Sequence, residues 1–222
     1  MKLVLDTANI NKIEDYLTYL PVEGVTTNPS ILKKEGQIDF KEHMLSIRQL
    51  IGKDMPLHIQ TIAEDYDGII KDAHRIYELI DEHVYVKIPV SKSGLAAIKT
   101  LKAEGFNITA TAIYSEIQAL LAVGFEVDYL APYVNRMSNL GTDPYRLINN
   151  VSQVITETNS KTNILGASFK NIDQVLKAVS AGSSHVTVGT DVIDVFLTNA
   201  NIDKAVEDFG NDWYSVFDTR EI

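Results

Sequence analysis

The sequence predicts an α/β fold, a single (β/α)₈ barrel over residues 1–222 in which residues 201–222 form an additional C-terminal helix. Short apolar runs rich in β-branched residues alternate along the chain with longer segments whose apolar residues recur at the helical period. Eight such strand-and-helix units fit into the 222 residues, at roughly 28 residues each. No Pro-, Gly- or Ser-rich linker interrupts them, which indicates one domain.

The predicted strands are the eight apolar runs. They lie at Leu3–Leu5, Val22–Thr27, Leu57–Ile62, Val84–Val90, Ile108–Ile113, Val127–Val134, Asn163–Ala167 and His185–Val188. Strands that alternate with helices pair in parallel through right-handed crossovers, and eight units are the number that closes a barrel. An open doubly wound sheet is the alternative, but its nucleotide-binding signatures, GxGxxG after a first strand and GxxxxGK[ST], are absent.

The predicted helices carry apolar residues at i, i+3, i+4 and i+7. They lie at Ile10–Leu20, Phe40–Leu50, Tyr66–Leu79, Leu95–Leu101, Ile117–Leu121, Tyr145–Ile155 and Val175–Val179. Candidate N-terminal caps precede six of them, at Asn9, Asp39, Ser93, Ser115, Asp143 and Asn171. Four are followed by a glycine that can end a helix in the left-handed conformation, at Gly52, Gly105, Gly124 and Gly182.

The last segment, residues 201–222, has an apolar face that must be covered. This face consists of Val206, Phe209, Trp213, Tyr214 and Phe217. Two surfaces are available to it, the bottom of its own barrel and a neighbouring subunit, and the residues alone do not choose between them.

The composition excludes several classes of protein. Hydrophobic residues make up 45% of the chain and charged residues 23%, as in ordinary globular proteins. The 20 Lys and Arg against 30 Asp and Glu give a net charge of −10, so we expect neither nucleic acid nor a membrane surface as a partner. The lack of cysteine excludes disulfides, thiol nucleophiles and thiolate zinc sites. We expect a cytoplasmic protein, because no apolar run approaches ~20 residues and the stretch before Asp6 is too short for a signal peptide.

The strand predicted at Val84–Val90 contains the most informative polar residue, Lys87. Period-two geometry places Tyr85 and Lys87 on the face opposite to the valines of this strand, and one of the two faces points into the barrel. A lysine held inside the barrel is desolvated, so its pKa falls and a neutral amine becomes available for Schiff-base chemistry. The alternative is a structural lysine whose stem lies on apolar surface while its ammonium reaches water.

Polar side chains also occur at the C-terminal ends of the other strands, where barrel enzymes carry their active sites. They are Asp6, Thr26, Thr27, Asn28, Gln60, Thr109, Thr111, Tyr133, Asn135, Arg136 and Ser168. Each alone has a structural explanation, such as a helix cap for Asp6, but their recurrence from strand to strand predicts a site. A carboxylate, an amide, hydroxyls and a lysine around one mouth suit carbonyl chemistry through an imine, and Arg136 and Ser168 can bind a phosphate.

Two other kinds of centre are disfavoured by residue spacing. The five histidines show neither HxH nor HExxH spacing, so we expect no metal. Ser168 lies in the string GASFK, which lacks the second glycine of the GxSxG nucleophile elbow.

Several strings together resemble the small transaldolase family. They are LDTAN at residues 5–9, GVTTNPS at 24–30, VKIP at 86–89, GL at 94–95, APYVNR at 131–136 and ASFK at 167–170. The resemblance runs over nearly the whole chain, and within the family the chain looks most similar to the fructose-6-phosphate aldolases. It implies a (β/α)₈ barrel that uses no cofactor and no metal, with Lys87 as the Schiff-base lysine.

The resemblance also implies roles for the other residues. The implied catalytic residues are Lys87, Asp6, Gln60, Thr111 and Tyr133, of which the last three match those that hold a catalytic water in fructose-6-phosphate aldolases. The implied substrate-binding residues are Thr26, Asn28, Ala131, Arg136 and Ser168. Asp6 and Asn28 would orient the donor hydroxyls and the lysine, Asp6 also serving in proton transfer, while Arg136 and Ser168 would hold the phosphate.

Three positions bear on the branch of the family. True transaldolases usually have Glu and Phe where this chain has Gln60 and Tyr133, which favours the aldolases. Thr109 departs from both patterns, because the aldolases are expected to have an apolar residue there and the transaldolases Asn. This departure leaves open how the donor is positioned and how much transfer accompanies cleavage.

The resemblance thus implies a class I aldolase that cleaves or forms fructose 6-phosphate from dihydroxyacetone and glyceraldehyde 3-phosphate. One alternative is a transaldolase that moves a dihydroxyacetone unit between sugar phosphates. Another is a non-catalytic barrel that binds sugar phosphates as a sensor, which would tolerate loss of the lysine amine. The resemblance further implies a homo-oligomer, in which the C-terminal helix reaches onto a neighbour in a pentameric ring and rings pair into decamers.

Overall fold

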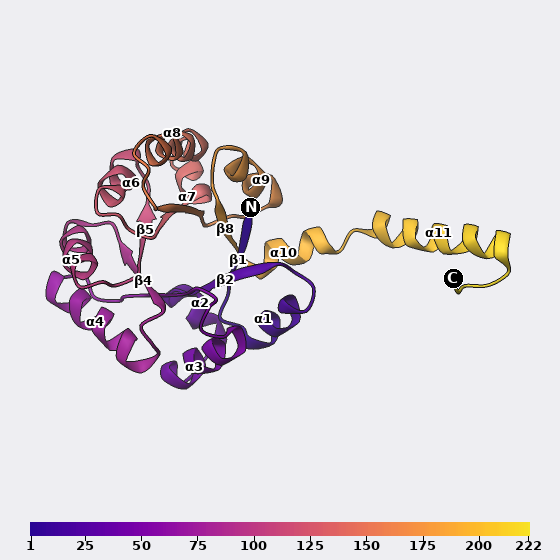
Figure 1. The fold of residues 1–222 in the computed structure, drawn as a ribbon, viewed down its shortest axis with the longest axis horizontal. Coiled ribbons are helices and arrows are strands. Elements are labelled where there is room, and N and C mark those ends of the chain that lie inside the picture. Colours follow the sequence, from indigo (N-terminus) through magenta and orange to yellow (C-terminus); the bar gives the residue numbers. More distant parts are fainter.

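Eight parallel strands close into a barrel in the computed structural model, which describes residues 1–222 (Figure 1). They are β1 (Lys2–Asp6), β2 (Val22–Thr26), β3 (Leu57–Gln60), β4 (Val84–Pro89), β5 (Ile108–Ile113), β6 (Tyr129–Pro132), β7 (Asn163–Gly166) and β8 (His185–Val188). Each strand pairs with the next along the chain, and β8 pairs with β1. The predicted (β/α)₈ barrel is confirmed, and the open sheet is excluded because both edges are paired.

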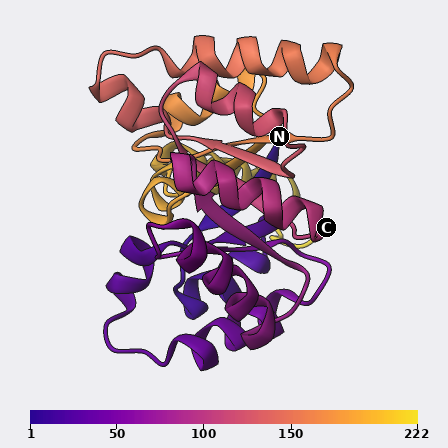
Figure 2. The same ribbon diagram turned by 90° about the vertical axis from the view of Figure 1, so that its left-hand side faces the viewer.

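Helices surround the barrel, as the side view in Figure 2 also shows. They are α1 (Ile10–Leu17), α2 (Pro29–Leu32), α3 (Phe40–Ile51), α4 (Tyr66–Leu79), α5 (Lys92–Ala103), α6 (Glu116–Val123), α7 (Val134–Asn139), α8 (Pro144–Glu157), α9 (Ile172–Ser180), α10 (Thr190–Leu197) and α11 (Ala200–Phe217), with a short 3-10 turn η1 (Lys33–Glu35) after α2. The seven predicted helices are all present.

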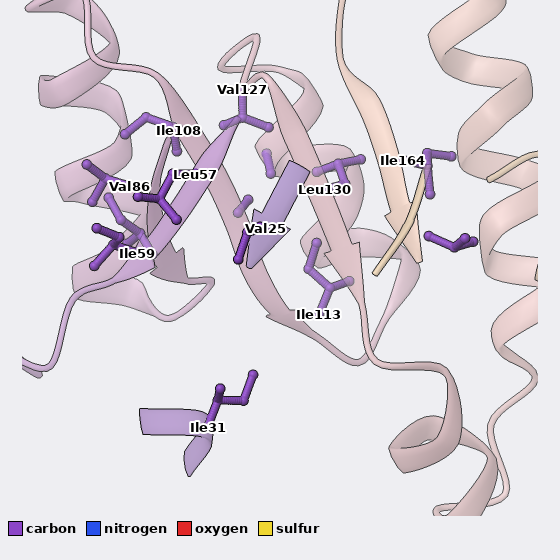
Figure 3. Packing of buried hydrophobic residues seen from close by; sticks show 14 of the residues in the cluster. Val25, Ile31, Leu57, Ile59, Val86, Ile108, Ile113, Val127, Leu130 and Ile164 are labelled. Carbon is purple, nitrogen blue, oxygen red and sulfur yellow. The ribbon is translucent and has the colours of Figure 1, made fainter. Parts of the chain in front are cut away.

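The strands bury both of their faces, as parallel strands do. On the outer face, Ile59, Val86 and Ile108 are aligned across β3, β4 and β5 and are fully or almost fully buried beneath the helices (Figure 3). Inside the barrel a separate small cluster contains Tyr129 and Leu165. The inner face is therefore filled toward the N-terminal ends of the strands, which leaves the C-terminal ends for a site.

Five of the six predicted N-terminal caps are confirmed and one is wrong. Asn9, Asp39, Asp143 and Asn171 accept hydrogen bonds from the first turns of their helices, and Ser115 forms a capping box. The wrong one is Ser93, which lies within α5. Ser91 caps that helix instead, because α5 begins at Lys92, and its hydroxyl accepts from the Gly94 N–H at 3.0 Å.

Two other local predictions are corrected. Gly124 has φ −61° and stays right-handed, and the left-handed residue of that connection is Glu126, with φ 52°. The sixth strand ends at Pro132, and Val134, which was expected to be its last residue, instead begins helix α7. Pro132 has no N–H to donate to a strand ladder, so it suits a strand end. Helices α2, α7 and α10 were not expected, and the first two are too short to show a period.

Helix α11 extends away from the barrel into solvent (Figure 1). None of its residues is buried, and Val206 and Phe209 are 65% and 71% exposed. Packing of this helix against the bottom of its own barrel is therefore wrong. No helix in the structure, α11 included, combines the length and apolarity needed to cross a membrane.

Gly94 lies where helix α5 comes very close to the end of the strand that carries Lys87. A Cβ atom at Gly94 would stand only 1.9 Å from the Pro89 carbonyl oxygen at the end of β4. Because a Cβ cannot approach a backbone oxygen so closely, α5 could reach its place against β4 only with glycine here.

We predict that Gly94→Ala lowers the free energy of unfolding by roughly 1–3 kcal/mol, because α5 must shift away from β4. The matched control is Gly124→Ala, whose Cβ would make ordinary contacts of 3.4 Å or more at a right-handed φ, so its effect should be small. Urea unfolding of both variants measures the difference. Equal stability of the two would contradict the packing described here.

Candidate active site

A cavity of about 260 Å³ opens at the C-terminal ends of the strands. Eight of the ten predicted site residues line it, namely Asp6, Thr26, Asn28, Lys87, Ala131, Tyr133, Arg136 and Ser168. Thr111 and Gln60 are not in its wall. The barrel therefore brings most of the predicted residues together in one cavity, although Asp6 and Ser168 lie far apart in the sequence.

Lys87 projects inward from β4 and is only 4% exposed. Its ammonium nitrogen, Nζ, donates a hydrogen bond of 3.0 Å to the Thr27 carbonyl oxygen at the end of β2. Burial lowers the pKa of this amine, while the nearby Asp6 carboxylate partly opposes the shift. The expectation of an inward, desolvated lysine is confirmed, and the alternative of an ammonium in water is wrong.

Asp6 ends β1 and lies in the same cavity wall as the lysine. Thr26 donates its hydroxyl hydrogen to Asp6 Oδ1 at 2.7 Å, and the Thr26 hydroxyl also contacts that of Thr187 on β8. Burial raises the pKa of Asp6, and the positive charge of Lys87 opposes this rise. Burial disfavours the charged form of both groups, which lowers the free-energy cost of moving a proton from the ammonium to the carboxylate.

Asn28 reaches the cavity from the start of α2. Its side-chain oxygen caps this helix by accepting from the Ile31 N–H at 3.0 Å, and Pro29 occupies the first helical position. The cap uses the oxygen, so the Asn28 amide NH₂ is the group left to donate to a ligand. The string TNPS thus has a local structural reason as well as a place in the site.

Thr111 and Tyr133 form a hydroxyl pair at the mouth. The Thr111 hydroxyl donates to Tyr133 Oη at 3.2 Å. Thr111 precedes an irregularity in β5 at Ala112, whose φ is 55°, and Tyr133 is the residue before α7. Burial raises the pKa of Tyr133, so it keeps its proton and can donate it in a hydrogen bond.

Gln60 lies beside Lys87, because the two residues are aligned across β3 and β4. Gln60 lines a neighbouring depression together with Pro29, Thr61 and Pro89, and it does not belong to the wall of the cavity itself. Gln60 Oε1 is buried without a hydrogen-bond partner. A buried acceptor of this kind is ready to receive a hydrogen bond from a ligand or water.

Arg136 and Ser168 stand together at one side of the cavity. The Arg136 guanidinium lies 4.7 Å from the centre of the Tyr133 ring and donates to Tyr114 Oη at 3.2 Å. Ser168 has φ 62°, a left-handed conformation that is uncommon outside glycine, and its carbonyl accepts from the Asn135 N–H. The charge of the arginine and the hydroxyl of the strained serine make this side of the cavity a candidate anion site.

The sequence reasoning missed several residues of the cavity wall, among them Lys34, Lys170, Thr187 and Asp191. Thr187 follows the same rule as the others, since it faces inward near the end of the eighth strand, and that rule applied to β8 would have found it. Lys34 lies in η1, and no pattern in the sequence indicates that this turn faces the mouth.

Thr109 is not in the cavity wall, although its backbone is aligned with Lys87 across β4 and β5. It is fully buried, and its hydroxyl shares a hydrogen bond of 2.8 Å with Nδ1 of His58. The threonine that departs from the family patterns at position 109 therefore contacts the barrel interior and not the cavity. No group of three or more His, Asp or Glu side chains in the chain is arranged to hold a metal ion.

Comparison with known proteins places these residues in a family context. A family model described as transaldolase/fructose-6-phosphate aldolase matches residues 3–220. The chain belongs to this family. It is 46% identical over all 222 residues to a probable fructose-6-phosphate aldolase of Streptococcus pneumoniae, whose whole length it covers.

Members described as transaldolases are also similar. A probable transaldolase of Kosmotoga olearia is 33% identical over 213 residues, 96% of each chain, and one of Methanococcus maripaludis strain C7 is 37% identical over 213 residues, 96% of this chain and 97% of that one. The chain is thus an enzyme of the transaldolase and aldolase kind.

We predict that Asp6→Asn lowers the pKa of Lys87 further, by about one unit, because the carboxylate that stabilises the ammonium is removed while the Thr26 hydrogen bond is kept. NMR titration of lysine-labelled protein measures this pKa, with Lys87→Met identifying the resonance. Asp15→Asn, on the outer surface of α1, is the control and should leave it unchanged. A rise or no change in Asp6→Asn would contradict the electrostatic account of the pair.

Proposed function

We propose that the protein is a Schiff-base aldolase that cleaves fructose 6-phosphate into dihydroxyacetone and glyceraldehyde 3-phosphate, or forms it from them, without a cofactor. The observation that carries the proposal is Lys87, a buried amine of lowered pKa that faces a polar cavity at the barrel mouth. The chain's membership of the family and its 46% identity to a probable fructose-6-phosphate aldolase also support the proposal.

The first step is attack of the neutral Lys87 amine on the C2 ketone of the substrate. Loss of the oxygen as water gives an iminium ion, and Asp6, whose charge acts on the Lys87 amine, would supply and take up the protons that this dehydration needs. The Asn28 amide group and Thr26 lie in the same wall, where they would bind the donor hydroxyls.

The second step breaks the bond between C3 and C4. Its electron pair moves into the iminium and leaves an enamine on Lys87, while the C4 hydroxyl loses its proton and becomes the aldehyde of glyceraldehyde 3-phosphate. A water that donates to Gln60 Oε1 and contacts the Thr111 and Tyr133 hydroxyls would accept this proton. Protonation of the enamine at C3 and hydrolysis of the iminium then release dihydroxyacetone and restore the amine.

The phosphate belongs to the aldehyde half of the substrate, so the phosphate group must lie at the end of the cavity far from Lys87. Arg136 and Ser168, which both line the cavity, would bind it by charge and by hydrogen bonding respectively. Lys34 and Lys170 in the same wall add positive charge around the mouth of an otherwise acidic protein.

Transaldolase activity is the second candidate, supported by the relatives described as probable transaldolases. The two reactions diverge at the enamine, which is either protonated or captured by an aldose phosphate. A coupled assay of fructose 6-phosphate without acceptor, following glyceraldehyde 3-phosphate, should show sustained release. Turnover only after addition of erythrose 4-phosphate would contradict the aldolase and favour the transaldolase. No turnover under either condition would favour a sugar-phosphate sensor.

We predict that Tyr133→Phe shifts the ratio of cleavage to transfer toward transfer by roughly tenfold, because one hydrogen bond to the protonating water is lost. The ratio is measured with fructose 6-phosphate in the absence and presence of erythrose 4-phosphate. Tyr145→Phe, at the start of α8, is the matched control. An unchanged ratio in Tyr133→Phe would remove Tyr133 from this role.

We also propose that α11 packs on a second copy of the chain, in a ring or pair of rings of five. The helix lies away from its own barrel, and its exposed apolar residues recur at the helical period, including Ile202, Val206, Phe209 and Phe217. Light scattering should give the mass of a pentamer or decamer, and Phe209→Asp should lower it, whereas Glu207→Gln should not. A monomeric mass for the unaltered protein would contradict the assembly.

A further inference from the structure

His58 is a titratable side chain in the middle of the barrel that the chemistry above does not use. It is fully buried, as is its partner Thr109. One hydrogen bond of 2.8 Å joins His58 Nδ1 to Thr109 Oγ1, and His58 Nε2 has no hydrogen-bond partner. A buried polar pair of this kind is costly unless its hydrogen bond is kept.

The hydrogen bond between His58 and Thr109 crosses the inner face of β4. His58 belongs to β3 and Thr109 to β5, and β4 lies between these two strands. Neighbouring strands are about 4.8 Å apart, so the two side chains together must span about two such spacings. The pair is called the His58–Thr109 bridge below.

The position of the bridge along β4 follows from the strand register. His58 is aligned with Tyr85 and Thr109 with Lys87, so the bridge crosses β4 between its two inward side chains. The His58 ring stacks on the Tyr85 ring, with centroids 5.0 Å apart and an angle of 26° between the planes. Tyr85 therefore lies on one side of the bridge, and Lys87 lies on the other.

Aromatic rings close the barrel beneath the bridge. The Tyr129 ring makes T-shaped contacts with the rings of His58 and His185, with centroids 4.9 and 5.2 Å away, and also with the ring of Tyr85. Water at the N-terminal end of the barrel is thus separated from Lys87 first by these rings and then by the bridge.

The bridge is uncharged. Burial, and next the positive charge of Lys87, hold the pKa of His58 well below its ordinary value. The other titratable or charged groups that act on His58 or Lys87 are Asp6 from β1, Arg48 from α3 and His185 from β8. A neutral ring next to the lysine adds no second positive charge to the interior.

We propose that His58 and Thr109 are positioning residues for Lys87. The hydrogen bond between His58 and Thr109 forms a floor that keeps water from beneath the lysine side chain and keeps the lysine amine directed to the barrel mouth. The catalytic consequence of the floor rests on the proposed function, but the floor itself is a property of the barrel interior. The floor also gives Thr109 a role. An apolar residue at this position could not form the hydrogen bond to His58, and an asparagine would form it with a differently shaped side chain.

Thr109→Val tests the bridge, because valine has the shape of threonine but cannot pair with His58. Both ring nitrogens are then unpaired and should draw water into the floor, so the pKa of Lys87 should rise by about one unit. In His58→Phe combined with Thr109→Val, no polar group is left unpaired, and the pKa should return toward that of the unaltered protein. NMR titration of lysine-labelled protein reads this pKa without substrate, and Thr100→Val on α5 is the control.

An unchanged pKa in Thr109→Val, or an equal rise in the double variant, would overturn the proposal. If Thr109→Val does not fold, His58→Leu replaces it, since it opens space beneath the lysine and should also raise the pKa; no change there would overturn the proposal as well. In the active enzyme the acid limb of kcat should move to higher pH in Thr109→Val. The titration is independent of turnover, so a protein that fails to cleave fructose 6-phosphate contradicts the proposed function and not the floor.

Discussion

Burial of one lysine amine inside the barrel is the constraint on which the site depends. A charged ammonium at a position that is 4% exposed costs several kcal/mol unless it is paired or gives up its proton. Lys87 has one carbonyl oxygen to donate to, on Thr27, and one carboxyl group near it, on Asp6. These contacts hold the side chain in place without restoring the solvation of water, so the pKa of the amine falls and its neutral, nucleophilic form is more accessible than that of a lysine in water.

The barrel supplies this environment because its two faces are used differently. The outer face of each strand packs against helices, and glycine at position 94 allows α5 to lie directly against the end of β4. The inner face is filled by rings and small side chains toward the N-terminal ends. Only the C-terminal ends are left open, and polar side chains lie there at the ends of the strands or, as with Tyr133 and Ser168, just after them. Lys87 thus stands between a closed interior and an open mouth.

Much of this arrangement could be predicted from the sequence. The strands bury both faces, so they appear as continuous β-branched runs, and polar residues within them, such as Lys87, are conspicuous. Contacts that cross an intervening strand could not be predicted, and the partnership of His58 with Thr109 is one of these. The helical position after Pro132 and the cap at Ser91 were also missed, and the residues of α11 alone did not decide between the two surfaces open to it. Each depends on where a chain turns, which a few residues of sequence do not determine.

The most direct test of the account is borohydride reduction of the protein in the presence of dihydroxyacetone, followed by mass spectrometry of its peptides. The account predicts one stable adduct, located on Lys87 and absent from Lys87→Met. No adduct in the unaltered protein, or an adduct that persists in Lys87→Met, would contradict the assignment of Lys87 as the imine-forming residue.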